Sequence, residues 1–578
     1  MAMDRKPIVS AKEVELLIAQ GQPIVIHEGY ALQLTQWIDR HPGGRLAILH
    51  MVGRDASDEI NVYHSARSLQ MMKQHRLGRI QEPWKNLEPP IRSPNYRDQI
   101  SQPKDSCIAA PVTKGTTAPV PGHRSRPSID IGPLGFLTPP SCTGVNPQPD
   151  LIPGGSCSRR IGSVQSADPE KQALLDTPDK ISSEGSRIAY ATTMEQKEIA
   201  EGILDYPSLD EETQQSIRLH YRALHQEIIN RGLYQCRYSE YGKESIRYAV
   251  LFCAFLYLLL TGWYLTSAIF LGLFWQQIMF TAHDAGHRGI TGNFVIDTLI
   301  GAFIADFCCG LSIGWWKSSH NVHHLITNMP EHDPDIQNIP LFSNSPTFMK
   351  SVFSTFYNFE FVWDGAADFL VPYQKYTYYP VMALARFNLY MLSWLHLLSP
   401  RATQLGSAWW TRHVELVFML FYWAIFGYAL VWCTLPDWPT RIGFVMISHM
   451  MTMILHVQIT LSHWGMPTSD LGPMESFPQR QLRTTMDVDC PAWLDFLHGG
   501  LQFQAVHHLF PRLPRHNLRE GQFLVREFCE KTNIQYNCYG FVKGNKVVLS
   551  RLEEVAKMVE MMVDCQKHMA ETGESGLN

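Results

Sequence analysis

Histidines occur in three short groups whose internal spacing suits the binding of metal ions. The groups are residues 283–287 (HDAGH), 320–324 (HNVHH) and 504–508 (QAVHH). Residues three or four apart lie on one face of a helix, so each group points its imidazoles in a common direction. Neutral imidazole is a good ligand for iron, zinc or copper. Ordinary surface or core histidines explain any single group equally well, so the metal hypothesis requires that the groups meet in the fold.

Long uncharged segments indicate where the chain crosses a membrane. Residues 248–282 form 35 positions without Asp, Glu, Lys or Arg, and residues 416–436 and 442–469 form uncharged runs of 21 and 28. One crossing needs about 20 apolar residues, so the first run predicts two helices that turn near residues 261–262. The other runs predict a second hairpin, broken at residues 436–439. A large soluble helical core is the alternative, and three uncharged runs of this length argue against it.

Two weaker apolar stretches differ from these runs because they carry charges. Residues 296–316 contain Asp297 and Asp306, and residues 377–399 contain Arg386. Both stretches are therefore predicted to lie at the membrane interface rather than across the membrane.

The predicted topology brings the three histidine groups to one side of the membrane. The first group follows the second crossing, no clean crossing separates it from the second group, and two further crossings precede the third. With one more histidine, the groups could hold two metal ions with three or four nitrogens each. They contain no Cys, which argues against iron–sulfur clusters and structural zinc. Their histidines are His283, His287, His320, His323, His324, His507 and His508.

The last uncharged run supplies the eighth candidate. His449, His456 and His463 are seven residues apart and would share one stripe of a helix. At about 1.5 Å rise per residue, His456 and His449 lie roughly 10 and 21 Å from His463, so they cannot all bind one centre. Only His463, at the end that faces the groups, is a candidate ligand. His456 is predicted to line a lipid channel or make a polar contact, and His449 to serve in packing.

Carboxylates in or near the groups could orient the imidazoles by accepting hydrogen bonds from them. Solvated loop carboxylates are the alternative. These residues are Asp284, Asp333 and Asp335.

A separate pattern lies near the N-terminus, where residues 8–84 are predicted to form a small α+β domain. His41 begins the turn His-Pro-Gly-Gly, and His64 follows it 23 residues later. HPGG alone could be an ordinary turn, but a second histidine at this spacing favours ligation of a haem from both sides. Residues 24–26 are predicted to form a strand and residues 32–39 a short helix. Acidic residues lie between the two histidines: Asp55, Asp58 and Glu59.

The motifs HDAGH, HNVHH and QAVHH, in this order and with these hydrophobic intervals, resemble the membrane-bound di-iron desaturases over residues 200–545. Gln504 heads the third motif, as in the front-end subgroup. The resemblance implies an oxidoreductase that uses O2 to remove two hydrogens from an unactivated pair of methylenes. It implies an orienting role for Gln504, since an amide is a poor iron ligand. The implied ligands of two non-haem iron ions are His283, His287, His320, His323, His324, His463, His507 and His508.

The N-terminal segment resembles cytochrome b5, including its ending at residues 77–80 (LGRI). This resemblance implies a haem b with His41 and His64 as axial ligands. His50 lies just one or two helical turns after the HPGG turn and is predicted not to bind the haem. A haem with both axial positions filled passes electrons singly. The acidic residues would suit docking to a basic face of an NADH-cytochrome b5 reductase. A di-iron oxygenase needs two electrons per turnover, and a fused cytochrome b5-like domain would supply them. The two resemblances therefore explain each other.

Composition separates these domains. Residues 85–192 are rich in Pro, Ser and Gly, with thirteen of the 36 prolines between residues 101 and 200, and are predicted to be a disordered linker. Residues 193–245 are predicted to be helical, with a helix start at residues 207–210. The predicted fold is thus a haem domain joined to an all-α membrane domain with about four transmembrane helices. That domain covers residues 246–545, and a C-terminal helix and tail cover residues 546–578.

Charge and cysteine usage exclude other classes of protein. The net charge of −5 provides no basic field for nucleic acid. The twelve Cys form no CxxC pair, which argues against a zinc ribbon and against a disulfide scaffold. Oligomeric state is left open.

Substrate and location are given by resemblance. Residues 499–515 (GGLQFQAVHHLFPRLPR) and the long linker are most similar to fungal sphingolipid delta-8 desaturases. This implies a delta-8 double bond in the long-chain base of a ceramide or related sphingolipid. The alternatives are a front-end fatty-acyl desaturase of delta-6 or delta-5 type and a lipid hydroxylase, against which Gln504 counts. A membrane haem protein without catalytic iron is a further alternative.

The expected location is the endoplasmic reticulum membrane, which the chain would cross several times. Basic residues before and after the first predicted hairpin place both of its ends in the cytosol, so the haem domain and the histidine groups are predicted to be cytosolic. They are Arg237, Lys243, Arg247 and Arg288.

Overall fold

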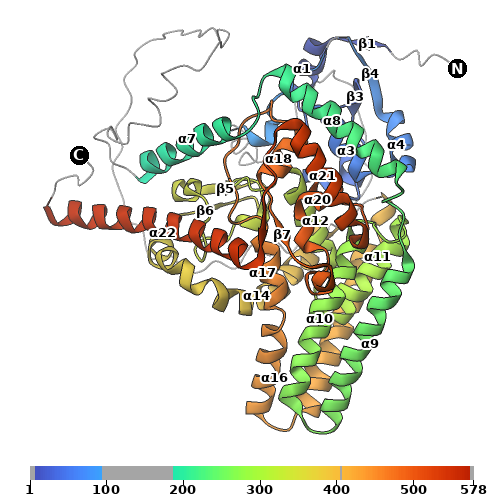
Figure 1. Cartoon of the computed structure of the whole chain (residues 1–578), viewed down its shortest axis with the longest axis vertical. Helices are drawn as coiled ribbons and strands as arrows, with labels where there is room; N and C mark the ends of the chain where they lie inside the picture. Colours follow the sequence, from blue (N-terminus) through green and yellow to red (C-terminus); the bar gives the residue numbers. More distant parts are fainter. Residues whose placement is uncertain (1–6, 82, 94–186, 404–405, 573–578) are drawn as a thin grey trace, which may run out of the picture. The chain divides into compact units, whose positions relative to one another are not determined.

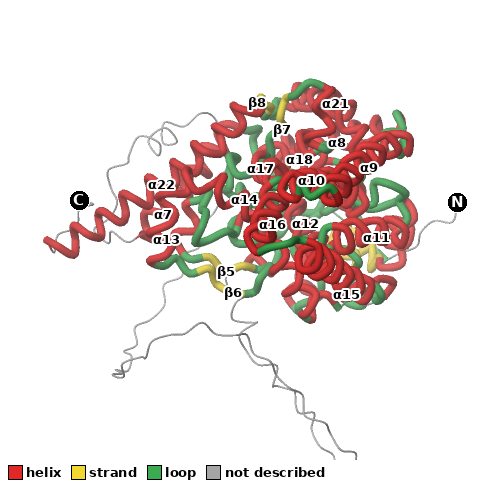
Figure 2. The backbone as a smooth tube through the Cα atoms, turned by 90° about the horizontal axis from the view of Figure 1, so that it is seen from below, coloured by secondary structure: helices red, strands yellow, loops and turns green. Residues whose placement is uncertain are grey.

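The structure is a computed structural model that describes residues 7–81, 83–93, 187–403 and 406–572. Most of the predicted linker lies outside these residues, and residues 187–192 belong to helix α7 (Arg187–Asp205). Helices dominate the described chain, and short strand pairs such as β5 (Val352–Ser354) with β6 (Phe359–Phe361) lie among them (Figure 2).

A four-stranded sheet supports the N-terminal domain. Its order is β1-β4-β3-β2, with β1 (Ile8–Val9) parallel to β4 (Arg76–Ile80) and β2 (Ile24–His27) antiparallel to β3 (Tyr30–Gln33). The strand predicted at residues 24–26 is confirmed as part of β2, where its β-branched side chains are buried.

The helix predicted over residues 32–39 is wrong. β3 ends at Gln33, and only a 3₁₀ turn at Ile38–Arg40 follows. Glu28 and Gly29 have φ of 51° and 75°, the left-handed conformation that a two-residue hairpin turn requires. The chain therefore reverses at this point, and Leu32 pairs with Val25 in the sheet.

Short helices of the N-terminal domain carry its two predicted haem ligands. His64 is the C-cap of α3, and His41 lies four residues ahead of α2. The domain's helices are α1 (Ala11–Ala19), α2 (Arg45–Leu49), α3 (Ser57–Tyr63) and α4 (Ala66–Met72).

The helix start predicted at residues 207–210 is confirmed by α8 (Glu211–Asn230). Asp210 is its N-cap, and the carboxylate accepts a hydrogen bond from Thr213 N at 2.9 Å. Ile217 and Leu224 are buried in one apolar cluster with residues of α21 (Leu518–Thr532).

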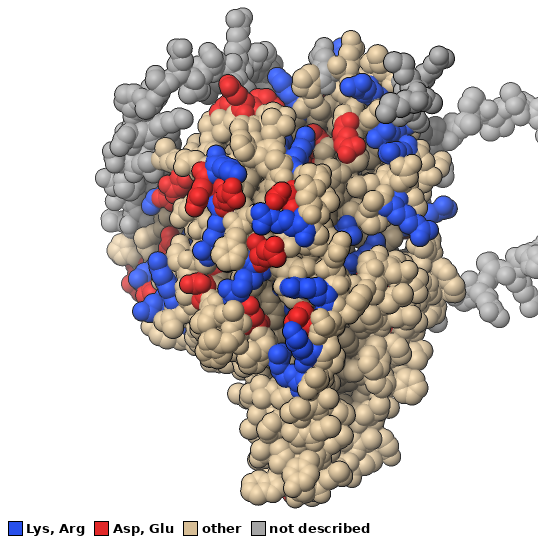
Figure 3. Space-filling model, turned by 45° about the vertical axis from the view of Figure 1, so that its right-hand side comes forward, with Lys and Arg blue, Asp and Glu red and all other residues tan. Residues whose placement is uncertain are grey.

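Apolar helices extend away from the part of the molecule that carries the histidines (Figure 1). α9 (Tyr238–Leu260) and α10 (Tyr264–Gly286) form the predicted hairpin, which turns at Gly262 with φ of 82°. α16 (Trp438–Met450) packs closely on α10 because a Cβ on Gly272 would lie 2.3 Å from Ser448 O. On the face seen in Figure 3, the charged side chains lie in the upper part of the molecule. The lower end, which these apolar helices form, shows no Lys, Arg, Asp or Glu.

Four segments of the described chain are long and apolar enough to cross a membrane. They are Tyr264–Gly286, Gly365–Leu398, Gly406–Thr434 and Trp438–Leu461. Four is also the predicted number of transmembrane helices. α9 is not among these segments, because charged residues occupy its N-terminal half. Two further helices, Phe294–Cys308 and Ile313–Leu325, meet at 116° and together form a broken span or a re-entrant loop.

The stretch at residues 377–399, predicted to lie at the interface, belongs to an apolar helix long enough to cross. The charge of Arg386 is satisfied inside the protein. Its guanidinium donates to Cys309 O at 2.6 Å and to Tyr390 Oη at 2.8 Å, and it lies 4.2 Å from the ring centre of Trp275. Internal partners therefore remove the penalty on which the interfacial prediction rested.

The C-terminal region closes over the histidine end of these helices. β7 (Asp487–Asp489) pairs in parallel with β8 (Cys538–Gly540), and Asp487 Oδ1 accepts from Ala505 N at 2.8 Å, which fixes the start of α20. Further helices of this domain are α11 (Phe294–Ala302), α12 (Ile313–Leu325), α14 (Gln374–Leu398), α15 (Thr411–Tyr422), α17 (Met453–Leu461), α18 (Phe477–Arg483), α20 (Gln504–Leu509) and α22 (Phe541–Thr572).

Candidate metal centre and haem site

The structure brings all eight predicted ligand histidines together from four parts of the chain. The end of α10 supplies the first motif, α12 the second and α20 the third, and His463 follows α17 by two residues. The ligand nitrogens of His283, His287, His320 and His507 lie within 4.8 Å of one another, as do those of His323, His463 and His508.

His324 lies between these two sets. Its Nε2 is 2.9 Å from Nε2 of His320, and its ring centre is 4.2 Å from that of His508. Two metal–nitrogen bonds of about 2.1 Å at a right angle place the nitrogens about 3 Å apart. The spacing of His320 and His324 therefore suits two ligands of one ion.

The donor atoms fit metal ions by their burial and their lack of other partners. Within the described residues, the buried Nε2 atoms of His283, His287, His507 and His508 make no hydrogen bond. Burial, and then neighbouring imidazoles, hold the pKa of His507 and His508 well below the usual value, and the same holds for His463. The rings of His463, His507 and His508 are therefore neutral, which is the form in which imidazole binds a metal. Against the effect of burial, the carboxylates of Asp333 and Asp335 raise the pKa of His323 to about 9.

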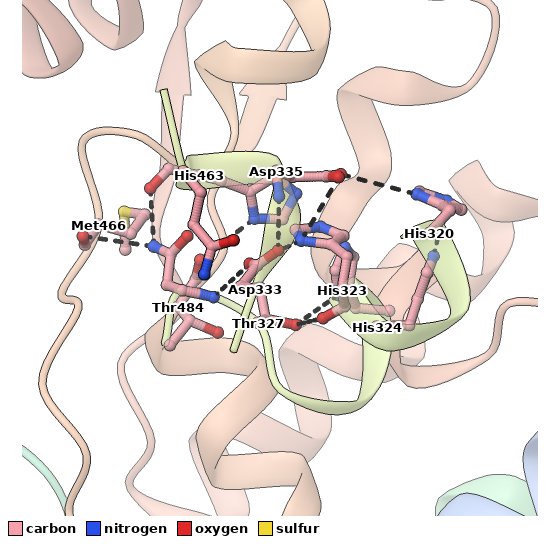
Figure 4. A network of polar contacts seen from close by, with 12 residues as sticks. His320, His323, His324, Thr327, Asp333, Asp335, His463, Met466 and Thr484 are labelled. Carbon is pink, nitrogen blue, oxygen red and sulfur yellow. Dashed lines mark hydrogen bonds and ion pairs between the residues drawn. The ribbon is translucent and has the colours of Figure 1, made fainter. Parts of the chain in front are cut away.

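Residues outside the motifs fix the orientation of the second set through Nδ1, and Figure 4 shows the partners of His323 and His463. His323 Nδ1 donates to Asp333 Oδ2 at 2.8 Å, His508 Nδ1 to Gln481 Oε1 at 2.8 Å, and His463 Nδ1 to Thr484 O at 3.3 Å. Each bond turns Nε2 toward the other members of the set. Asp333 was predicted for this role, whereas Gln481 and Thr484 were missed.

Asparagine at Asp333 is expected to lower metal content without unfolding the chain. The carboxylate also accepts from Asn328 N at 2.7 Å, and the isosteric amide cannot accept as strongly from two donors. Partners of this kind contribute about 10- to 100-fold to metal affinity. Non-haem iron per chain after dialysis against a chelator measures the loss, and Asp364→Asn, at the exposed N-cap of a distant helix, is the control. Equal iron retention in both variants would contradict the role of Asp333.

The other candidates take different places. Asp284 lies 3.5 Å from His283 Nδ1, and its second oxygen accepts from Tyr241 and from Arg515. Asp335 Oδ2 lies 3.8 Å from His323 Nδ1 (Figure 4). Gln504 is buried at the start of α20. In the described part of the chain, its amide makes no hydrogen bond to a histidine of the three motifs.

The two remaining histidines of the predicted stripe lie away from the centre, and residues 451–452 interrupt the helix between them. His449 stacks on Phe387 at 4.7 Å and bonds Val445 O, which agrees with the predicted packing role. His456 Nδ1 donates to Met382 O at 3.0 Å, the polar contact that was one of its two predicted roles.

His41 and His64 face each other across a gap that fits a haem. Their ring centres are 6.0 Å apart, and two imidazole–metal bonds of about 2 Å with about 1 Å from each nitrogen to its ring centre give about 6 Å. Each Nδ1 donates to a backbone carbonyl, Gly44 O at 3.0 Å and Ile60 O at 2.9 Å, so each Nε2 is left for the iron. His50 lies instead against His332, with ring centres 5.2 Å apart, as expected for a residue that does not bind the haem.

The acidic residues between the haem histidines do not form the exposed docking face that was predicted. Asp58 and Glu59 are 5% and 7% exposed, and Asp58 pairs with Arg222 of α8 at 2.7 Å. Burial, and then the neighbouring Asp58, raises the pKa of Glu59 to about 7. Asp58 therefore faces α8 of the same chain, and the half-buried Asp55 accepts from Ser57 N and Ser57 Oγ.

Comparison with known proteins decides the family. Residues 10–81 match the family described as "Cytochrome b5-like Heme/Steroid binding domain", and residues 260–540 match "Fatty acid desaturase". The chain is 44% identical over 568 residues to a protein of Emericella nidulans named "Delta 8-(E)-sphingolipid desaturase", with 98% of this chain and 97% of the relative covered. The chain belongs to the cytochrome b5-fused membrane desaturases.

Other relatives of this desaturase support the same family. A protein of the same name from Komagataella phaffii is 46% identical over 563 residues, covering 96% of this chain and 95% of the relative. The "Delta(8)-fatty-acid desaturase" of Helianthus annuus is 38% identical over 299 residues, which cover 51% of this chain and 62% of the relative. The desaturase is thus an oxidoreductase, and its family implies a haem in the N-terminal domain and a metal in the helical domain. The predicted fold class is confirmed.

Proposed function

We propose that this desaturase introduces a delta-8 double bond into the long-chain base of a ceramide or related sphingolipid. The observation that carries the proposal is the convergence of the histidine sets in a chain that aligns from end to end with delta 8-(E)-sphingolipid desaturases. Per double bond, the reaction removes two hydrogens from the chain, consumes one O2, two electrons and two protons, and releases two waters.

The eight histidines would hold two iron ions, which supply the activation of O2. His283, His287, His320 and His507 would hold one ion, and the second set would hold the other, with His324 between them. Asp333, Gln481 and Thr484 orient the second set, and burial keeps bulk water away from these donors. Gln504 would orient the third motif or the substrate.

Electrons would reach this centre from a haem b held by His41 and His64, and an NADH-cytochrome b5 reductase would reduce that haem. The apolar helices and the family support a membrane protein. We place it in the endoplasmic reticulum membrane, with the haem domain and the histidine sets on the cytosolic side, because basic residues flank that end of the first hairpin.

Expression in a host that lacks unsaturated sphingoid bases tests the substrate. We expect a delta-8 double bond in the long-chain bases and no new double bond in the fatty acids, when the two fractions are hydrolysed and analysed separately by mass spectrometry. A double bond confined to the fatty acids would make the enzyme an acyl desaturase, and a hydroxylated base would make it a hydroxylase. A host that carries the His508→Ala variant is the background control.

A further inference from the structure

The haem domain packs directly against the catalytic domain. Val62 belongs to an apolar cluster of α8 and α21, and the ring of Tyr63 meets that of His324 edge-on, with centres 6.1 Å apart. Asn321 Nδ2, between two histidines of the second motif, donates to Gly43 O at 3.3 Å. The backbone next to each predicted haem ligand therefore contacts the catalytic domain.

Two arginines of the catalytic domain lie beside the His41–His64 pair. Arg512 Nη1 donates to His64 O at 2.8 Å. Arg288 comes from the adjoining segment, because a Cβ on the next residue, Gly289, would lie 3.4 Å from Arg512 O. Its positive charge acts on both imidazoles. Arg288 directly follows the first histidine motif, and Arg512 follows the third by four residues.

Within the described residues, neither guanidinium forms an ion pair with a carboxylate. The negative charge of Asp297 acts on both from a longer distance, while its oxygens accept hydrogen bonds from Thr291 and Gly292. Arg288 lies 5.1 Å from the ring centre of Phe294, and Lys317 lies 5.6 Å from the same centre, so a third positive charge is near. Arg288 and Arg512 also repel each other. By contrast, the buried Arg483 has a carboxylate oxygen 2.8 Å away. Partly buried cations that lack an ion-pair partner are unfavourable, and an anion in direct contact with them would relieve this cost.

A haem b supplies such an anion, because its porphyrin carries two propionate carboxylates. We propose that Arg288 and Arg512 bind the propionates of the haem held by His41 and His64. Arginine suits this role because its planar fork binds carboxylates through two hydrogen bonds. The bound haem then forms part of the contact between the haem domain, which donates the electrons, and the catalytic domain. The inference rests on the proposed haem function and adds positioning residues from the catalytic domain.

The test compares two haems in the full-length chain. Chain produced in haem-deficient cells is loaded with haem or with haem dimethyl ester, in which both propionates are esterified, and transfer of the haem to apomyoglobin is timed. Arg288→Gln/Arg512→Gln with native haem, and wild type with the ester, are each expected to release haem about tenfold faster or more, as loss of charge-assisted hydrogen bonds implies. The double variant should also shift the haem reduction potential downward, because positive charge favours the reduced form.

The decisive measurement is the combination of both changes. If the arginines bind the propionates, the ester adds no further acceleration in the double variant. Additive effects, or an unchanged release rate in the variant, would overturn the proposal. Arg441→Gln, which removes an arginine of α16 bonded to Leu435 O and Trp432 O, is the matched control. Absence of haem from wild-type chain would instead refute the proposed haem function.

Discussion

Alanine at His508 is expected to reduce desaturation by more than about 100-fold while the haem spectrum stays unchanged. The substitution removes one of three nitrogens that lie within 4.8 Å of one another. In the described part of the chain, Nε2 of His508 is buried without a hydrogen-bond partner and its Nδ1 is held by Gln481, so the variant loses an imidazole whose free nitrogen is fixed in place. Residues that merely orient a ligand already contribute about 10- to 100-fold to metal affinity, and loss of the ligand itself should exceed this.

Iron analysis separates this effect from misfolding. Wild type should contain about three irons per chain, one in haem and two outside it, and the His508→Ala variant should lose non-haem iron while keeping its haem. The matched control is His449→Phe, because His449 stacks on Phe387 and, among the described residues, its hydrogen bonds go to Val445 O and Ser448 Oγ of its own helix. Turnover that survives alanine at position 508 would remove the third motif from the catalytic centre.

Spacing within the sequence predicted those features that depend on neighbouring residues. The i, i+3 and i+4 positions put the histidines of one motif on one helical face, and His463 was separated from His449 and His456 by helical rise alone. Likewise, the apolar run up to Ala282 with its Thr261-Gly262 break defined the hairpin of α9 and α10.

Other features depend on residues that have no fixed spacing from the motifs. Gln481 reaches His508 because α18 packs against α20. Thr484 reaches His463 because the chain after α18 runs beside the end of α17, where Met486 N donates to Ser462 O. No local pattern marks either residue. Arg386 is compatible with an apolar helix because Cys309 O, far away in the sequence, accepts from it. In the same way, the acidic residues near His64 were predicted to be exposed, whereas Arg222 of α8 pairs with Asp58.

Alanine at His64 is expected to lower desaturation by at least about 100-fold, even when the host supplies free cytochrome b5. The fused domain stands at an effective concentration in the millimolar range, far above that of a free donor. Without the second axial imidazole, the gap beside His41 loses one of the two nitrogens that fit the iron. Product per chain and haem content by pyridine haemochrome are the measurements.

Structure explains why a free donor should not rescue this variant. Val62 and Tyr63, which precede His64, are packed against the catalytic domain, so the unloaded domain still covers the surface that a donor would need. His75→Gln is the matched control in the same domain, since His75 contacts Trp37 and Gln74 and lies outside the haem gap. If free cytochrome b5 restores full activity to the His64→Ala chain, electrons reach the metal centre by another surface, and the packed contact is not the route of transfer.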